Sequence, residues 1–472
     1  MKDCAKAYLQ KLGYEVNTKA LEIIQECDDW YSNRVIEDFH KRKNLNGVEC
    51  KLNRMNFAKR CCADDANLCE IISVAPEKNN DSLGFIEELL QKNGFDVQYR
   101  KQLEKTSACG TTGAYICLKN ATYFQDKDGN ISVKGGRIGI NYVEPDCIIP
   151  LTVDNDVVTE CAFCATNMVK GKEKTTLVIF TNENNLYKAE TVVFDGLGNK
   201  LDNECMTIQL GDVKPFSVMT IAEVNNLDNM KGYGLPKVYN SIPVFKVVDL
   251  CYNLLYGDLG KGDKLVFLNE LLACIQQDEN GNPYLTPQQK EIFILLGRDG
   301  GKLPDEKTLV QEYNPEIRID AITKAFELAL SLLSMSFGYG TKKYTFENGR
   351  ITTATEYIGE KQDSVQELNK QRKNATDYIT DIVHAAMWFG NQFLGTSYNV
   401  EESLSIEFDD SYITDKESEL ERKRNDALSF DIPQLTVWYL MDAYNLSEEE
   451  ATKLVEQKLE KEEKDPDGEV ED

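Results

Sequence analysis

The stretch LSLLSMSFGYGTKKYTFENGRITTATEYI, Leu330–Ile358, connects two strong helical patterns through a segment that contains three glycines. Upstream, apolar residues recur at three- and four-residue steps and predict a helix that ends at Gly338 and Gly340. Downstream, Thr353 or the threonine before it can cap the next helix, and Glu356 follows Thr353 at the spacing of a capping box. The sequence therefore predicts a helix, a projecting loop and a second helix.

The second helix is predicted over residues 354–394. Small and apolar residues recur along it at three-, four- and seven-residue steps, interrupted by Arg372, at Ile358, Val365, Leu368, Ala375, Ile379, Ile382, Ala386, Phe389 and Phe393. At about 1.5 Å per residue, some forty residues extend roughly 60 Å. Two alternatives remain open, a straight helix shared between layers or subunits and a helix kinked near Gly359.

The composition is that of an acidic globular protein. The 472 residues are too many for one ordinary core and predict about two to four domains. Lys and Arg total 53 and Asp and Glu total 79, which gives a net charge of −26. Because binding phosphate needs a basic face, this charge argues against a general nucleic-acid binder. The acidity indicates solubility, with a surface that meets DNA without adhering to it as the alternative.

We expect no membrane-spanning segment and no secretory signal peptide. No apolar run reaches the roughly 18 residues needed to cross a bilayer, and the segment around 325–337 is interrupted by Glu327 and by serines. The N-terminal residues lack the apolar core of a signal peptide. We expect a soluble protein that is made and kept in a cytoplasm and has no membrane partner.

The 14 cysteines are scattered, so reduced thiols are expected. The only CxxC pair is Cys161 and Cys164, which would point to opposite faces of a strand. No second CxxC or neighbouring His pair accompanies it, so we expect neither a metal site nor redox use. Cys61, Cys62 and Cys69 follow a helical period and are predicted to be small core residues.

Periodicity divides the first half of the chain into two parts. Residues 1–105 are mostly helical in pattern, and the segment 81–95 has an Asp or Ser cap at its start and a glycine at its end. Residues 108–222 alternate as strands separated by turn dipeptides. Gly129 stands at the fourth position of DKDGN, not the sixth, so this segment is read as a hairpin turn and not as a calcium loop.

No catalytic constellation is apparent. His40 and His384 are the only histidines, and neither lies in a recognisable nucleophile motif; the sequence also lacks GxSxG and GxxxxGK[ST]. Asp409 and Asp410 could in principle bind a metal for phosphodiester cleavage, but no third acid or His stands at a defined spacing. We expect a protein that is not an enzyme and that has no cofactor.

Five stretches, taken together, resemble one protein family. They are LNRMNFAKRCCADDANLCE (52–70), GTTGAYI with VEPDCIIPL (110–151), NNLDNMKGYGLPKVYNSIPVFKVVDLCYN (225–253), LSLLSMSFGYGTKKYTFENGRITTATEYI (330–358) and IEFDDSYITDKESELER (406–422). Their order and separation resemble the portal proteins of tailed double-stranded DNA bacteriophages, in the branch found in siphophages and prophages of Gram-positive bacteria. Tyr357 stands where this branch usually has Val, and several usual apolar core positions are Cys.

The resemblance implies an α+β portal fold with wing, stem, clip, tunnel loop and C-terminal helical crown. The implied parts are a wing (1–237), a stem helix (238–261), a clip (262–316), a second stem helix (317–337), a tunnel loop (338–353), a long helix (354–394), a return strand to the wing (395–415), and a crown with an acidic tail (416–472).

The family's role implies a ring, usually of about twelve subunits, at one capsid vertex. Double-stranded DNA would be packaged and later ejected through its channel. The implied partners are the terminase large subunit, the major capsid and scaffold proteins, and a head–tail adaptor. The implied location is the virion, with assembly in the host cytoplasm. The alternative function is a ring-forming head–tail adaptor or assembly protein that does not translocate DNA, although such chains are usually shorter.

Within the implied tunnel loop, Lys342, Lys343 and Arg350 are basic residues in an otherwise acidic protein. The resemblance implies that they face the DNA, together with Thr352 and Thr353. The implied hinges are Gly338, Gly340 and Gly349. The other hypothesis is that the two lysines lie in solvent between subunits.

Overall fold

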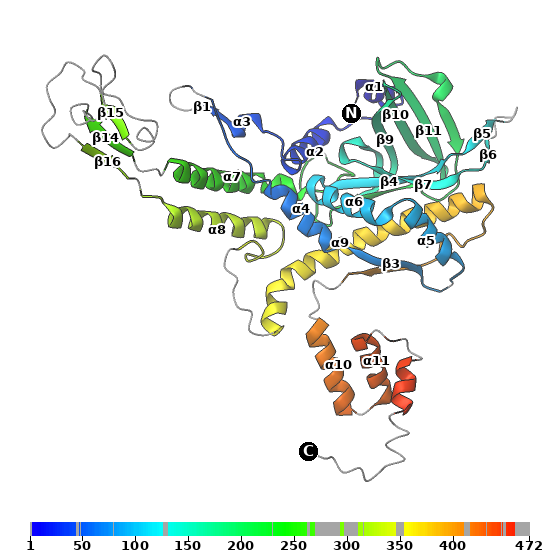
Figure 1. The fold of residues 1–472 in the computed structure, drawn as a ribbon. Helices are drawn as coiled ribbons and strands as arrows, with labels where there is room; N and C mark the ends of the chain where they lie inside the picture. The colour runs from blue at the N-terminus through cyan, green and yellow to red at the C-terminus, as the bar shows by residue number, and fades with distance from the viewer. Residues whose placement is uncertain are drawn as a thin grey trace, which may run out of the picture.

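The computed structural model describes most of the chain. The described residues are 2–43, 47, 49–78, 80–125, 131–228, 230–261, 265–269, 293–296, 310–314, 316–345, 354–409, 416–430, 432–444, 446 and 450–457. Figure 1 shows a mixed α+β body from which a pair of helices projects toward a small sheet. Among the described helices, none is long and apolar enough to cross a membrane.

The first part of the chain is helical, as predicted. Its helices are α1 (Asp3–Lys11), α2 (Thr18–Tyr31), α3 (Glu37–His40), α4 (Phe57–Asn67), α5 (Leu83–Lys92) and α6 (Phe95–Cys109), with a hairpin of β1 (Lys41–Lys43) and β2 (Glu49–Lys51). The α2 helix begins where the Asn17 side chain accepts a hydrogen bond from the Ala20 amide. Its apolar face recurs every three or four residues, and it buries Ala20, Ile24, Cys27 and Trp30.

Of the Asp or Ser cap predicted for α5, the serine alternative is wrong. Ser82 makes no side-chain bond to the first turn of the helix. Its Oγ instead donates a hydrogen bond to Glu402 Oε2 at 3.0 Å, and both residues are buried. A buried carboxylate needs such a donor more than an exposed helix end does, because water can satisfy the helix end.

The strand-rich part forms two principal antiparallel sheets. One has the order β13–β4–β7, from Phe216–Thr220, Thr111–Lys119 and Arg137–Val143. The other has the order β12–β11–β10–β9–β8, from Met206–Gln209, Leu186–Asp195, Lys172–Glu183, Val157–Val169 and Ile148–Asp154. A separate hairpin pairs β5 (Thr122–Gln125) with β6 (Ile131–Lys134). Asn184 and Asn185, both at positive φ, form the two-residue turn between β10 and β11.

The five-stranded sheet has an apolar core on each face. Cys161 belongs to the large core shared with the helices, whereas Cys164 belongs to a small core covered by α1. The prediction that this pair points to opposite faces is therefore confirmed. Cys61, Cys62 and Cys69 are buried in the large core, as expected.

Two helices form the projecting pair. The α7 helix spans Lys237–Lys261 and the α8 helix spans Ile319–Ser336. Near their outer ends, the Arg318 guanidinium holds both carboxylate oxygens of Asp258 at 2.9 and 2.8 Å. Beyond them, β14 (Leu265–Asn269) pairs in parallel with β15 (Phe293–Leu296) and antiparallel with β16 (Val310–Tyr313).

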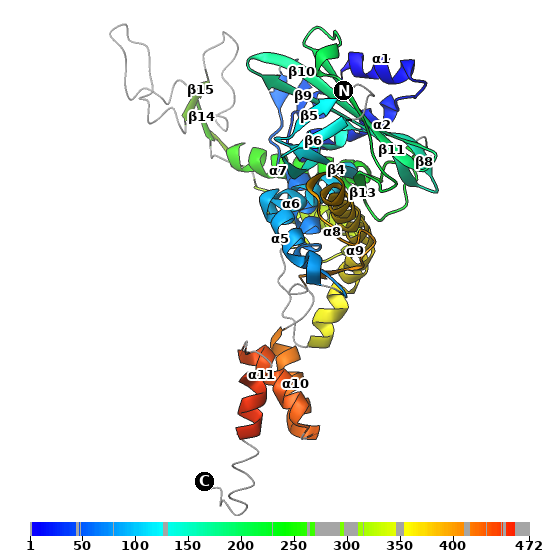
Figure 2. The same cartoon turned by 90° about the vertical axis from the view of Figure 1, so that its right-hand side faces the viewer.

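The long helix α9 spans Ala354–Phe389 and ends in a π-helical turn, η6 (Gly390–Leu394). Figure 1 shows its first turns set at an angle to the rest, and the remainder lies along the body. Strand β17 (Leu404–Phe408) then returns and pairs antiparallel with β3 (Ile71–Pro76). Helices α10 (Lys416–Phe430) and α11 (Pro433–Tyr444) follow, and Figure 2 shows them standing apart from the body. Residues 450–457 are also helical.

A close backbone contact fixes the passage from α6 to β4. Gly110 ends α6 with a φ of 82°, in the left-handed region that favours glycine. A Cβ at Gly110 would lie 2.3 Å from the Gly234 carbonyl oxygen, and a Cβ at Gly234 would lie 2.2 Å from the Gly110 oxygen. Glycine is therefore required at both positions.

We expect Gly110→Ala to destabilise the body. The unfavourable φ costs on the order of 1–3 kcal/mol, and displacement of the backbone around Gly234 adds to it. Gly84→Ala in α5 is the matched control, because nothing lies within 4 Å of its added Cβ; it should stabilise by about 0.4–1 kcal/mol. Urea unfolding followed by circular dichroism measures both changes, and an equal response of the two variants would contradict the close contact.

Candidate functional site

The segment that follows α8 is anchored to the body by aromatic side chains. Phe337, Tyr339 and Tyr344 are buried, with exposed fractions of 0%, 2% and 9%. Between them, Gly338 and Gly340 have φ values of 80° and 70°, so the chain turns where the sequence predicted turns. The base of the predicted loop is thus a packed structure.

Two tyrosines of this segment bind adjacent acids on α4. The Tyr339 hydroxyl donates to Asp65 Oδ1 at 2.8 Å, and the Tyr344 hydroxyl donates to Asp64 Oδ2 at 3.1 Å. Asp64 also accepts a hydrogen bond from Arg60 Nε at 3.0 Å. Consecutive acids at the buried side of α4 therefore hold both ends of a six-residue turn.

The first residue of α7 completes this arrangement. Lys237 Nζ lies 2.9 Å from Asp65 Oδ1 and 3.0 Å from Glu367 Oε1 on α9. The side chains of Lys237, Asp65 and Glu367 are 1%, 8% and 8% exposed, so the contact is closed to bulk water. Burial alone lowers the pKa of Lys237, but attraction by Asp65 and Glu367 outweighs it and the pKa lies above its usual value.

We call Asp64, Asp65, Lys237, Tyr339, Tyr344 and Glu367 the buried charge cluster. It joins α4, α7, α9 and the segment between α8 and α9. The Tyr344 amide also donates to the buried Ser334 Oγ of α8 at 3.0 Å. The cluster therefore fixes where the chain leaves α8 and how α9 lies relative to that exit.

The two described lysines of the predicted loop follow this anchor. Lys343 is half-buried, and its Nζ lies 5.4 Å from the centroid of the Tyr339 ring. Such a contact places the ammonium over an aromatic face. Lys342 is exposed. The other predicted loop residues, Gly349, Arg350, Thr352 and Thr353, lie outside the described residues.

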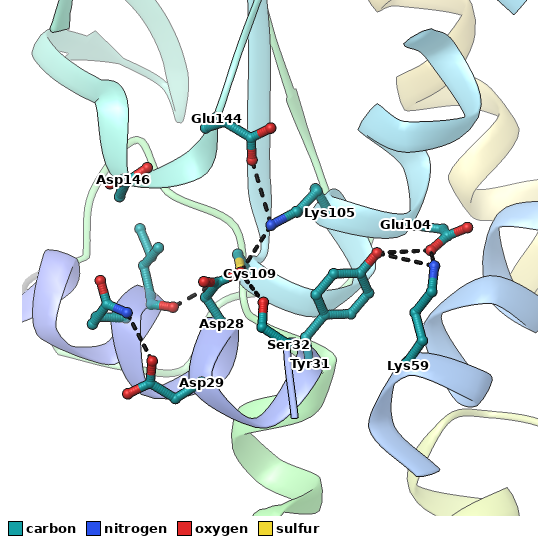
Figure 3. Close-up of polar contacts among 12 residues, drawn as sticks. Asp28, Asp29, Tyr31, Ser32, Lys59, Glu104, Lys105, Cys109, Glu144 and Asp146 are labelled. Carbon is teal, nitrogen blue, oxygen red and sulfur yellow. Dashed lines mark hydrogen bonds and ion pairs between the residues drawn. The ribbon is translucent and has the colours of Figure 1, made fainter. Parts of the chain in front are cut away.

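A second polar network holds the helical part of the body together (Figure 3). Lys105 Nζ on α6 lies 2.8 Å from Asp28 Oδ1 on α2 and 3.4 Å from Glu144 Oε2. The Tyr31 hydroxyl donates to Glu104 Oε2 at 2.8 Å, and Lys59 of α4 binds the same carboxylate. These contacts tie α2, α4 and α6 together, and α4 also carries Asp64 and Asp65 of the buried charge cluster.

Both histidines have structural contacts. His40 Nδ1 accepts a hydrogen bond from the Ile36 amide at 3.0 Å, so Nε2 carries the proton that faces Asp249 Oδ2 at 3.1 Å. His384 Nε2 lies 2.9 Å from the Glu402 carbonyl oxygen. Neither ring is placed next to a nucleophile by these contacts.

The acid pair considered for metal binding is only partly described. The Asp409 amide donates to the Glu70 carbonyl at 2.8 Å, and its carbonyl accepts from Arg372 Nη2 at 3.1 Å. Asp410 lies outside the described residues. Within the described part of the chain, no group of three or more His, Cys, Asp or Glu side chains is arranged to hold a metal ion.

We expect Lys237→Met to destabilise the protein strongly. The substitution leaves Asp65 and Glu367 buried beside each other without their shared cation, at a cost of about 3–5 kcal/mol. Adding Glu367→Gln to Lys237→Met removes one of these charges and should recover part of the loss. Urea unfolding of the three proteins measures the effect.

Lys370→Met is the matched control, since Lys370 also pairs with Glu367, at 3.3 Å, but is 59% exposed. An exposed pair of this kind contributes about 0–1 kcal/mol. Similar losses for Lys237→Met and Lys370→Met would contradict the buried role of Lys237.

Comparison with known proteins gives distant likenesses. No protein-family model and no curated protein matches the chain. Among solved structures, it is similar to a chain of "Neck of native GTA particle computed with C12 symmetry", with a TM-score of 0.37 and 11% identity over 85% of this chain and 89% of that chain. It is also similar to a chain of "Neck of empty GTA particle computed with C6 symmetry", with a TM-score of 0.37 and 10% identity over 78% of this chain and 83% of that chain. The chain thus resembles a component of a gene transfer agent neck, but these scores are too low to assign that component's fold or role to it.

Proposed function

We propose that this chain is the subunit of a portal ring that passes double-stranded DNA into and out of a capsid at one vertex. The order of the five sequence stretches supports the proposal. The observation that carries it is the projecting pair α7 and α8, which has an uncovered apolar face and leads into a loop anchored by the buried charge cluster.

The uncovered face lies on α8. Phe326, Leu330 and Leu333 are buried, whereas Leu328, Leu332 and Met335 are 63%, 44% and 57% exposed. The exposed three follow steps of four and three residues, so they form one stripe on the helix. Val247 and Leu254, two turns apart on α7, are 45% and 49% exposed.

These stripes support a ring of identical subunits. A helix that is apolar on two sides needs a second neighbour besides its partner within the chain. In a head-to-tail ring each subunit meets one neighbour on either side, so different faces of α7 and α8 can both be covered. We propose about twelve subunits, as the resemblance implies.

The proposed DNA contact is the loop between α8 and α9. Lys342, Lys343 and Arg350, with Thr352 and Thr353, would face the channel and touch phosphate, while acidic surfaces elsewhere keep the duplex from adhering. Gly338, Gly340 and Gly349, the proposed hinge positions, would let the chain leave α8, turn and enter α9. The proposed role involves no catalysis and no cofactor.

The proposed partners follow the parts of the chain. Residues 262–316 would dock the terminase large subunit during packaging and the head–tail adaptor afterwards. The body would meet the major capsid and scaffold proteins. The protein would assemble in the host cytoplasm and remain in the virion. A head–tail adaptor ring without DNA translocation is the second candidate, because uncovered stripes on α7 and α8 would serve it equally.

Electron microscopy of the purified full chain tests the ring. We expect axial views with a central hole of at least roughly 20 Å, which is wide enough for a DNA duplex to pass. A stable closed dimer would contradict the proposal, because it leaves no passage along its axis.

Reversing the charges of Lys342 and Lys343 to Glu tests the DNA contact. We expect normal rings but a loss of packaged DNA, because a repulsive site replaces a weakly attractive one. Lys170→Glu with Lys172→Glu is the charge-matched control, because both lysines are exposed, one in the turn after β9 and the other at the start of β10. Packaged DNA per particle is the measurement. Equal packaging by both double variants would favour the adaptor or place the two lysines outside the channel.

A further inference from the structure

One long strand of the five-stranded sheet is paired along only part of its outer side. Strand β9 pairs with β10 along residues 161–169, whereas its pairing with β8 ends at Phe163 and Ile148. The chain before β8 runs away from the sheet in the 3-10 turn η2 (Pro145–Cys147). Past this point β9 has a neighbouring strand on one side only, within the part of the chain that the structure describes. We call its outer side at residues 164–169 the β9 edge.

The turn after β9 determines which backbone groups face this edge. The two-residue turn Lys170–Gly171 has φ values of 50° and 76°, so Val169 and Lys172 exchange backbone hydrogen bonds. Successive residues of an antiparallel strand direct their N–H and C=O groups to opposite sides. Thr166 and Met168 therefore direct both groups away from β10. No described residue bonds to these backbone groups.

The β9 edge lacks the features that protect most exposed strands. Natural edges carry charged side chains, proline or a bulge. The sequence CAFCATNMV, residues 161–169, contains no charge and no proline, and its register with β10 is regular. The side chains of residues 165–169 are exposed, with Met168 at 69% and Val169 at 43%. An uncharged edge of this kind can accept a further strand.

A groove of about 570 Å³ follows the β9 edge. Four consecutive residues of β9, 164–167, line it. Since successive side chains of a strand point to opposite faces, consecutive lining residues place the groove along the strand's edge. The opposite wall includes Asn141 of β7 and Glu144, and Tyr115 stacks on Phe163 inside it with ring centroids 5.1 Å apart. A strand added to β9 would therefore direct side chains into this groove.

Charge restricts which segment fits. The described groove lining contains Glu144, whose side chain is 61% exposed, and no basic side chain, so nucleic acid is not matched. Asp146 is exposed near the same end, whereas Lys170 and Lys172 are exposed at the other end of the edge. A matching segment is uncharged in its middle, basic at the first end and acidic at the second.

A second copy of the β9 edge does not fit the proposed ring. Two such edges would pair about a two-fold axis and close a dimer, whereas the neighbours in a ring are related head to tail. The net charge of −26 also makes copies of the chain repel one another. These considerations favour a segment from another protein.

We propose that the β9 edge docks an extended segment of another protein, which adds to the sheet as a strand and pairs with the backbone of Thr166 and Met168. The groove selects uncharged side chains in the middle of that segment. The choice of another protein over a second copy rests on the proposed ring, whereas the site itself requires only the body.

Peptide binding to the full chain tests the site. The probes are two fluorescein-labelled peptides of alternating Val and Thr, with Lys and Asp at their ends in either order. By fluorescence polarisation we expect saturable binding of one of them that Thr166→Pro weakens at least several-fold. Proline removes an N–H that faces the edge, but the pairing with β10 does not use that N–H.

Thr166→Val is the matched control for Thr166→Pro. Both variants lose the hydroxyl that lies 3.0 Å from Thr175 Oγ1, but only proline changes the backbone donor. Thr166→Val should therefore bind like the unchanged protein. Equal affinities of all three proteins, or no binding of either peptide, would overturn the docking site. If the same chain still forms rings, the portal proposal stands.

Hydrogen exchange tests the edge without a substitution. In the dissociated chain we expect the amides of Thr166 and Met168 to exchange several-fold faster than those of Asn167 and Val169, which β10 protects. Bound peptide should remove this difference, and a peptide N-methylated at alternate residues should not. Protection of Thr166 and Met168 without peptide would assign the edge to a second copy and overturn the proposal. Such protection in rings leaves the portal proposal standing, and in a stable closed dimer it overturns both.

Discussion

The pairing of Lys237 with Asp65 and Glu367 is the constraint on which the rest of the arrangement depends. Removing several charges from water costs several kcal/mol for each ion, and their mutual attraction largely offsets this cost. The main effect is therefore to fix the relative positions of α4, α7 and α9, because any displacement that separates them leaves a charge buried alone. The two tyrosine hydroxyls extend the same constraint to the exit of α8.

This constraint fixes the position of the chain where it leaves α8, and it acts less on the outer parts of α7 and α8. Where the chain leaves α8, aromatic side chains and buried polar bonds hold it on all sides. Farther out along α7 and α8, the Arg318 and Asp258 pair is largely on the surface, and apolar stripes remain uncovered. In a ring, the geometry of each subunit would be set at its base, and the fit between subunits would be set along the helices.

The sequence predicted elements better than it predicted contacts. Helical and strand periods identified α7, α8, α9 and the hairpins of the body, because each depends on local spacing. The opposite facing of Cys161 and Cys164 also followed from the period of a strand. Of the Asp or Ser cap predicted for this helix, the serine alternative is wrong, because the Ser82 hydroxyl bonds to a distant carboxylate, Glu402.

The buried charge cluster was missed for a similar reason. Asp64, Asp65 and Lys237 are of residue types that are mostly exposed, and Glu367 falls among the polar positions of a long helix. The available signals were two adjacent acids within an apolar helical period and a lysine at the very start of α7. Only tertiary structure brings these groups together, so no local pattern could have paired them.

The pairing of β17 with β3 also determines the order in which parts of the body can fold during synthesis. The sheet of residues 71–76 cannot form until residues 404–408 have been synthesised. The α9 helix is synthesised shortly before residues 404–408. At synthesis rates of roughly 5–20 residues per second, the delay is on the order of tens of seconds. The body therefore stays incomplete until residues 404–408 have left the ribosome, and residues 71–76 lack their strand partner throughout this interval.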